Sequence, residues 1–203
     1  MKAIFSAIAI AAVSAIVSAA PTAKRQALSL IPASYNYVVS QAEPDVDQAP
    51  VYGNPNIAVI SRTNGYNDID TIVDFAIPDI TSIPGATSSS TCSFVVYNVA
   101  ALSGSQTLQV YTLNQWVDLF SPPVTWNSAD VQSVDQNYGT YEVFSGATTG
   151  PSVAIDGGSW TFPCQFGQTV QFLLRPEGDN DYITWSQGGG GAVLTGAYIQ
   201  VSN

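Results

Sequence analysis

The sequence predicts an all-β protein, an antiparallel β-sandwich or jelly-roll-like fold of about ten short strands. Runs rich in Val, Ile, Tyr, Phe and Thr recur along the chain, and clusters of Gly, Asn, Asp and Ser separate them. No stretch after Arg25 sustains the apolar period of a helix together with a helix cap. The chain has 203 residues, and we expect residues 35–203 to form a single domain.

The clearest strand is expected over residues 69–77. Apolar and β-branched side chains alternate there with polar ones, so one face is made by Ile69, Thr71, Val73, Phe75 and Ile77. Asp70 and Asp74 take the opposite face, and Pro78 ends the strand. The remaining strands are expected at 35–40, 56–61, 93–99, 107–113, 138–144, 159–162, 169–175, 182–185 and 192–201.

Residues 1–20 are predicted to be a secretory signal peptide. A short positive start, Met1-Lys2, precedes an apolar run over 3–17 that ends in the small residues of 17–20. The alternative is a buried helix or a membrane span, but the run is shorter than the ~20 residues that a span needs. We expect a secreted, extracellular protein with no membrane span.

Residues 21–34 are predicted to be a pro-segment and a loose leader to the first strand. Lys24 and Arg25 form the only dibasic pair and resemble the site that fungal secreted proteins present to a kexin-type protease, with the cut after Arg25. The alternative is two incidental surface charges. Cleavage there would leave Arg62 and Arg175 as the only cations beside fifteen acids.

The two cysteines, Cys92 and Cys164, are expected to form one disulfide. An oxidising compartment favours their pairing, whereas a pair of buried free thiols is the alternative. Neither cysteine lies in a C-x-x-C motif or beside a basic residue, so the expected role is structural.

Composition excludes several classes of function. The chain contains no histidine, which removes Ser-His-Asp and Cys-His catalysis and His-ligated metal sites. With 5 Lys and Arg against 15 Asp and Glu, the formal net charge is -10, which argues against nucleic acid as a partner. Asp70 and Asp74 lie roughly 13 Å apart along their strand, too far for a glycosidase pair. We interpret the acids as solvated groups on the surface.

Two blocks of sequence resemble one fungal family. The first joins the strand of 72–78 to 91–96, around Cys92, and the second joins 162–172, around Cys164, to 196–199. Together they resemble the C-terminal domain of the But proteins, the Uba-three-binding proteins, from about Tyr35 to the C-terminus. The resemblance implies a β-sandwich without established catalysis. The family name also implies a partner in the cytosol, the activating enzyme of a ubiquitin-like modifier, which the export signal contradicts.

A fainter likeness, through 108–111, Trp116 and 125–127, is to carbohydrate-associated sandwich domains. Exposed aromatic rings stack on sugar rings, and flanking amides bind hydroxyl groups. The candidates for glycan binding are Trp116, Trp126, Trp185 and Asn127, with Trp160, Tyr66, Tyr138, Tyr141 and Tyr182 as further aromatic residues. The alternative is that these aromatic side chains fill the core of the sandwich.

Calcium is a second candidate ligand, because it needs only oxygen ligands. Asp68 and Asp70 lie beside one turn and Asp179 and Asp181 in another, although neither cluster has EF-hand spacing. The alternative is that these Asx-rich turns are purely conformational. No metal site is firm, and no cofactor is predicted.

These observations favour a secreted, non-enzymatic protein that acts at a cell surface or wall as a structural or interaction domain. The alternative is a domain of the carbohydrate-binding-module type. The expected partner is a cell-wall polysaccharide or another extracellular protein.

Overall fold

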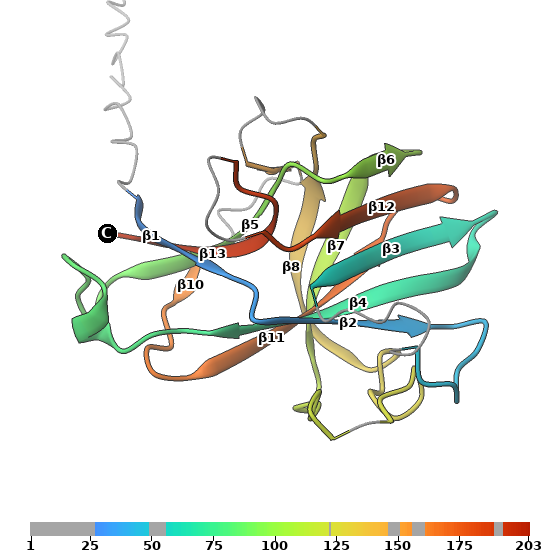
Figure 1. The fold of residues 1–203 in the computed structure, drawn as a ribbon, viewed down its shortest axis with the longest axis horizontal. Coiled ribbons are helices and arrows are strands. Elements are labelled where there is room, and N and C mark those ends of the chain that lie inside the picture. The colour runs from blue at the N-terminus through green and yellow to red at the C-terminus, as the bar shows by residue number, and fades with distance from the viewer. Residues whose placement is uncertain (1–26, 49–55, 122, 146–150, 156–160, 189–192) are drawn as a thin grey trace, which may run out of the picture.

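The structure, a computed structural model, describes residues 27–48, 56–121, 123–145, 151–155, 161–188 and 193–203 (Figure 1). Within these residues, 13 strands form two antiparallel sheets and there is no α-helix; η1 (Ile80–Ser82) is a single 3₁₀ turn. The predicted all-β sandwich is therefore confirmed, with three strands more than expected. The signal peptide and the dibasic pair Lys24 and Arg25 lie outside the described residues. No helix in the described part of the chain is long and apolar enough to cross a membrane.

The smaller sheet contains four strands in the order β1, β13, β5, β10. They are β1 (Ala27–Pro32), β13 (Gly196–Ser202), β5 (Thr91–Tyr97) and β10 (Thr161–Pro163). Strand β1 corrects the prediction of a loose leader, because its backbone pairs with β13 from Ala27 to Pro32 and Ile31 is buried. Pro32 then ends the strand, as proline does where a further ladder hydrogen bond would need its missing N–H.

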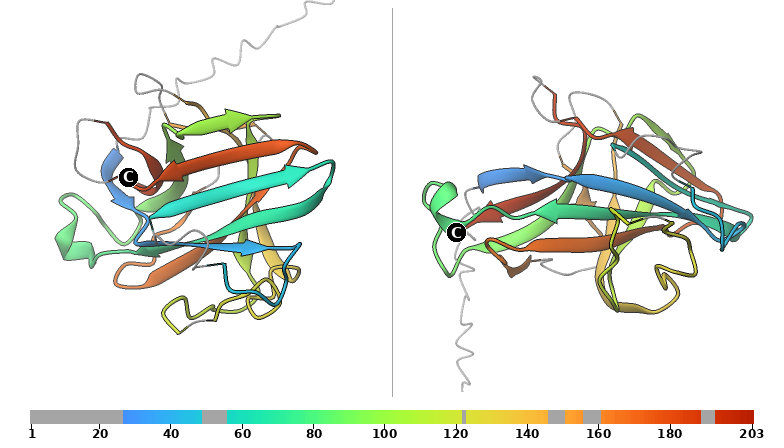
Figure 2. Two further views of the ribbon diagram at one scale, coloured as in Figure 1. Left: turned by 45° about the vertical axis from the view of Figure 1, so that its right-hand side comes forward. Right: turned by 60° about the horizontal axis from the view of Figure 1, so that its bottom comes forward.

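The larger sheet is strongly curled and contains nine strands (Figure 2). Its order is β6 (Ala101–Ser103), β12 (Asp181–Ser186), β3 (Ile57–Thr63), β4 (Tyr66–Ala76), β11 (Thr169–Pro176), β7 (Thr107–Leu113), β8 (Val134–Glu142) and β9 (Val153–Ala154). Strand β2 (Tyr35–Ser40) pairs with β4 outside this order. The β3–β4 hairpin turns at Asn64 and Gly65, both with positive φ, which is the sequence chemistry of a two-residue hairpin turn.

The main core lies between the two sheets. Val73 and Phe75 of β4 and Ile77, one residue beyond its end, are all part of it, and all three belong to the apolar face predicted for 69–77. Phe75 packs edge-on against Phe94 of β5 and Phe172 of β11, with ring centroids 6.1 Å apart in both pairs. The predicted alternation is therefore confirmed for these three residues, whereas Ile69 of the same predicted face is only half-buried and belongs to neither core.

A second core lies on the outer face of the larger sheet. Residues 114–121 and 123–133, which we call the strap, connect β7 to β8 and fold back over β2, β4 and β11 (Figure 1). Six apolar side chains of the strap pack against four from these strands; they are Val117, Leu119, Val124, Trp126, Ala129 and Val131 against Tyr37, Val39, Ile72 and Leu173. The outer face of β4 is therefore buried. The interpretation of Asp70 and Asp74 as solvated acids is wrong, since their exposed fractions are 0% and 3%.

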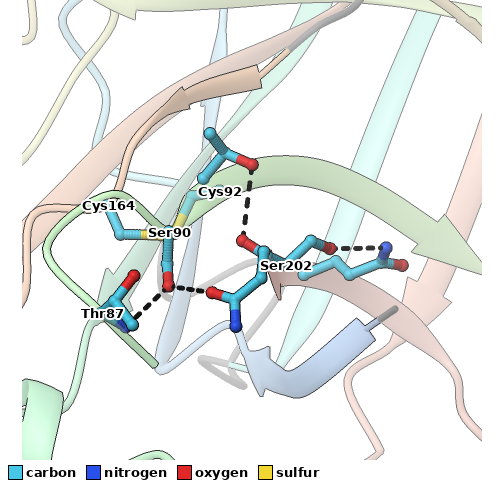
Figure 3. The surroundings of a disulfide bond; sticks show 8 residues. Thr87, Ser90, Cys92, Cys164 and Ser202 are labelled. Atoms are coloured by element: carbon cyan, nitrogen blue, oxygen red, sulfur yellow. Dashed lines mark hydrogen bonds between the residues drawn. A yellow bond between two sulfur atoms is a disulfide. The ribbon is translucent and has the colours of Figure 1, made fainter. Parts of the chain in front are cut away.

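The predicted disulfide is present. Cys92 of β5 is bonded to Cys164, which follows β10, and their Cα atoms are 5.0 Å apart (Figure 3). Beside it, Ser90 Oγ accepts a hydrogen bond from the backbone N–H of Thr87 (2.9 Å) and donates one to Asn203 Oδ1 (2.5 Å). The disulfide fastens β10 to β5, and the Ser90–Asn203 bond fastens the start of β5 to the residue that follows β13.

Candidate binding site

The structure separates the tryptophans that were predicted to bind a glycan. Trp116, at the start of the strap, is 57% exposed, whereas Trp126 and Trp185 are 3% and 1% exposed. Trp126 belongs to the second core and Trp185 to the main core, so neither ring has a face for a ligand. Glycan binding by these two residues is therefore wrong, and the alternative, that their side chains fill the core, is confirmed for them. Trp160 lies outside the described residues.

Asn127 lies on the exposed side of the strap. Its Nδ2 donates a hydrogen bond to Asp45 Oδ1 (2.8 Å), and its backbone N–H donates to the carbonyl of Pro44 (3.0 Å). Both bonds fasten the strap to the segment that follows β2. The structure therefore gives Asn127 a contact within the fold, beside a Trp126 ring that is buried.

Trp126 contacts the half-buried guanidinium of Arg175. The Arg175 guanidinium lies 5.7 Å from the ring centroids of both Tyr111 and Trp126. Its Nε donates to Asp70 Oδ2 (2.9 Å) and its Nη2 to the carbonyl of Val131 (2.7 Å). A planar guanidinium can stack on aromatic rings while its edge makes hydrogen bonds, which a lysine ammonium cannot do.

Burial of the two outer-face carboxyls changes their protonation. Desolvation raises the pKa of Asp70 to about 7, even though the nearby Arg175 guanidinium acts in the opposite direction. Burial also raises the pKa of Asp74, which a hydrogen bond from Gln171 partly offsets. These carboxyls are structural groups under the strap.

The predicted calcium ligands make other contacts. Asp68 forms a two-pronged ion pair with Arg62 (Nε–Oδ1 2.6 Å, Nη2–Oδ2 2.7 Å). Asp181 accepts hydrogen bonds from the backbone N–H groups of Ser105 (2.5 Å) and Gly178 (2.6 Å), which joins two turns. Asp179 accepts one from the Gly65 N–H at its backbone carbonyl (2.9 Å). No group of three or more acidic or cysteine side chains that could hold a metal is found among the described residues.

Trp116 borders a pocket of about 210 Å³ at the start of β11. Aromatic and aliphatic side chains form part of its wall: Leu113, Trp116, Tyr138, Phe162, Val170 and Phe172. The polar part consists of uncharged side chains: Thr112, Gln115, Gln165, Thr169 and Gln171. None of the lining residues is charged, so the pocket is chemically neutral in a chain of formal net charge -10.

The strap is held in place at this pocket by Gln171. The Gln171 side chain donates from Nε2 to the carbonyl of Val117 (2.8 Å) and accepts at Oε1 from the Val117 N–H (3.0 Å). Gln171 also bonds the carboxyl of Asp74, which lies opposite it in the β11–β4 register. Because Val117 directly follows Trp116, this pairing determines where the Trp116 backbone lies.

Of the pocket residues, Trp116 and Tyr138 were among the aromatic candidates predicted from the sequence. The polar lining residues outside β7 were not predicted; they are Gln115, Gln165, Thr169 and Gln171. Gln115 is adjacent to Trp116 in sequence, and this adjacency is the one signal that could have found it. Gln165, Thr169 and Gln171 reach the pocket only because the disulfide and the β11–β4 pairing bring β10 and β11 beside the strap. Strand pairing of this kind is not visible in local sequence patterns.

No protein-family model matches this chain, and no curated protein matches it significantly. The resemblance to the C-terminal domain of the But proteins stays a prediction.

Proposed function

We propose that this chain is a secreted, non-enzymatic recognition domain that binds an uncharged glycan at a cell surface or wall. The observation that carries the proposal is the neutral pocket beside Trp116. An exposed indole offers an apolar face to the C–H groups of a sugar ring, and uncharged polar side chains beside it can bind the sugar's hydroxyl and amide groups.

Three observations support binding without catalysis. Hydrolysis of a glycosidic bond requires two carboxyl groups close to the bond, and no Asp or Glu lines the pocket. Asp68, Asp70 and Asp181 are used in ion pairs and turns within the fold. The sequence contains no histidine that could act as a general base.

Secretion is proposed from the predicted signal peptide and agrees with the disulfide, since disulfides persist in oxidising compartments. Membership of the But family, which implies a β-sandwich without established catalysis, would agree with the observed fold and with the proposed non-enzymatic role. We therefore retain that family as a proposal.

Retention on insoluble chitin, β-glucan and cellulose tests the function. We expect the secreted protein to bind at least one of them. Trp116→Ala should weaken this binding at least tenfold, because truncating an aromatic anchor costs about 2 kcal/mol or more. Tyr66→Ala is the matched control, since Tyr66 is 73% exposed and lies outside the pocket.

Absence of retention on all three polysaccharides, or equal retention of the Trp116→Ala variant, would contradict the proposal. Release of soluble sugar by the purified protein would contradict its non-enzymatic part.

A further inference from the structure

The pocket has an apolar floor. Phe162 and Phe172 line it and are only 8% and 2% exposed, and we call this buried, apolar part of its wall the floor. Tyr138 lies edge-on to both rings, with centroids 5.5 Å from each. Val170, half-buried, completes this part of the wall. A hydroxyl group placed on this floor would lose its water without gaining a hydrogen-bond partner, whereas a methyl group would lose nothing.

The pocket has an amide rim. Gln115 lies in the strap and Gln165 in the connection between β10 and β11; both are exposed and make no side-chain hydrogen bonds to the described part of the chain. The deeper Gln171 is already used, because both of its amide atoms bond Val117. Thr112 Oγ1 likewise accepts the N–H of Gln136 (3.1 Å). The polar side chains that remain for a ligand are therefore the Thr169 hydroxyl and the two carboxamides, and each carboxamide offers both an N–H donor and a C=O acceptor.

The size and charge of the pocket restrict the ligand further. A volume of about 210 Å³ is below the range of roughly 300–1,000 Å³ that accommodates drug-sized ligands, so the pocket takes a single sugar unit. No cation lines it to bind a uronic acid, and no carboxylate lines it to bind an amino sugar. The only arginines of the described residues, Arg62 and Arg175, are paired with Asp68 and Asp70.

We propose that the pocket recognises an N-acetylated hexosamine unit, with the acetamido methyl on the Phe162–Phe172 floor and the acetamido amide bonded by the glutamine rim. This proposal rests on the proposed function and specifies its substrate class. An acetamido group combines the two features that the pocket offers: a methyl for an apolar floor and an N–H and C=O for a carboxamide rim. Trp116 then stacks on the ring that carries the group.

Two ligands that differ only at this group provide the test. Tetra-N-acetylchitotetraose (chitotetraose below) and cellotetraose share the same β-1,4-linked backbone, but each unit of chitotetraose carries an acetamido group at C2 where cellotetraose carries a hydroxyl. Measured by titration calorimetry on the full secreted protein, chitotetraose should bind at least tenfold more tightly, since one methyl group in an apolar pocket changes affinity by about 10-fold or more. Gln165→Leu should remove most of this preference. Gln168→Leu is the matched control, because Gln168 is exposed in the same turn but does not line the pocket.

The outcomes separate the two proposals. Cellotetraose binding as tightly as chitotetraose overturns the acetamido inference and leaves glycan binding intact. Absence of binding to both tetrasaccharides and to the three insoluble polysaccharides overturns the proposed function as well. A preference for chitotetraose that persists in Gln165→Leu overturns the role of the glutamine rim. Both exposed glutamines can be replaced without disturbing a core, so circular dichroism and the unfolding temperature should match those of the unaltered protein.

Discussion

At the scale of single residues, the outer face of β4 shows the most unusual chemistry of this molecule. Asp68 and Asp70 pair with the two arginines of the described chain, and Asp70 is completely buried beneath Trp126 and the strap. The Asp70 carboxyl thus carries an elevated pKa while in contact with a cation, because burial outweighs the attraction of Arg175. A buried charge pair contributes little to the free energy of unfolding, but removing one partner lowers that free energy strongly because the other charge is left buried and unpaired.

This chemistry predicts a specific pH dependence. The pKa of Asp70 lies near 7 in the folded state and near 3.8 in the unfolded chain. Between these values the folded state binds more protons, so the contribution of Asp70 to the free energy of unfolding falls as pH rises from about 4 to about 7. Asp74, whose pKa is also raised, acts in the same direction. Thermal unfolding measured from pH 4 to pH 8 should therefore show a lower unfolding temperature at the upper end.

The Asp70→Asn variant isolates this effect from general repulsion among the acids. Its unfolding temperature should change less between pH 4 and pH 7 than that of the unaltered protein. Asp135→Asn, at an exposed position of β8, should keep the original slope. An equal slope in Asp70→Asn and the unaltered protein would show that Asp70 is ionised across the whole range.

The same residues show where sequence reasoning stops. The alternation over 69–77 correctly assigned Val73, Phe75 and Ile77 to the main core. It wrongly assigned Asp70 and Asp74 to solvent, because period-two alternation describes a strand with only one covered face. The cover on the second face is an irregular segment, and no periodicity in 114–133 indicates that its apolar side chains reach Ile72 and Leu173. For the same reason the burial of Trp126 could not be predicted.

At the scale of elements, the strap determines where the proposed glycan-binding residue Trp116 lies. It places Trp116 at the pocket and is itself fastened to β11 at two points, Gln171 and Arg175. Both anchors come from one strand, with alternate residues on the face that meets the strap. The geometry of the pocket therefore depends on the alignment of β11 with the strap.

Removal of one anchor should separate binding from folding. Gln171→Leu keeps the volume but leaves the N–H and carbonyl of Val117 without their partner, at a cost of about 1–3 kcal/mol in unfolding free energy. We expect the variant to fold and its affinity for chitotetraose to fall at least fivefold, because Trp116 loses its support. Gln200→Leu, a half-buried glutamine of β13 far from the strap in the strand order, should bind normally. Undiminished affinity in Gln171→Leu would refute the positioning role.

The strands that the sequence failed to predict are short strands at the edges of the sheets. Ten expected strands exist, and two of them, β2 and β7, have the expected bounds. Three strands were missed: β1, β6 and β9. They have two to six residues, and each is an edge strand that pairs with only one neighbouring strand in its sheet. Short edge strands carry little alternation of their own, since the neighbouring strand supplies the hydrogen bonds that define them.

At the scale of the whole molecule, the disulfide is the one covalent link between distant parts of the chain. It joins residues 72 positions apart and holds β10, which carries the pocket residue Phe162, against β5. The cysteine count and the predicted compartment were sufficient to predict this bond. The proximity of its partners to the pocket was not predictable, because it depends on the pairing of Phe162 with Cys92 across the sheet.

Replacing both cysteines should destabilise the protein while retaining the fold. The Cys92→Ser, Cys164→Ser double variant should lose roughly 4 kcal/mol of unfolding free energy, as expected from the chain entropy released by opening a loop of this length. Urea denaturation monitored by tryptophan fluorescence measures the loss. A change below 1 kcal/mol would indicate that strand pairing alone fixes β10. Alkylation of the unreduced native protein should label no thiol, since both cysteines are bonded.

The order of strands in the smaller sheet has a consequence for biosynthesis. The last strand of the chain, β13, lies inside that sheet, between β1 and β5. Residues 27–32 therefore have no partner until residues 196–202 have been synthesised, and long-range pairing of this kind makes folding slow. A nascent chain with this topology cannot complete its smaller sheet before β13 has been synthesised. Until then, the apolar side chains that β1 and β5 present to the main core, such as Ile31 and Phe94, have no complete sheet to pack in.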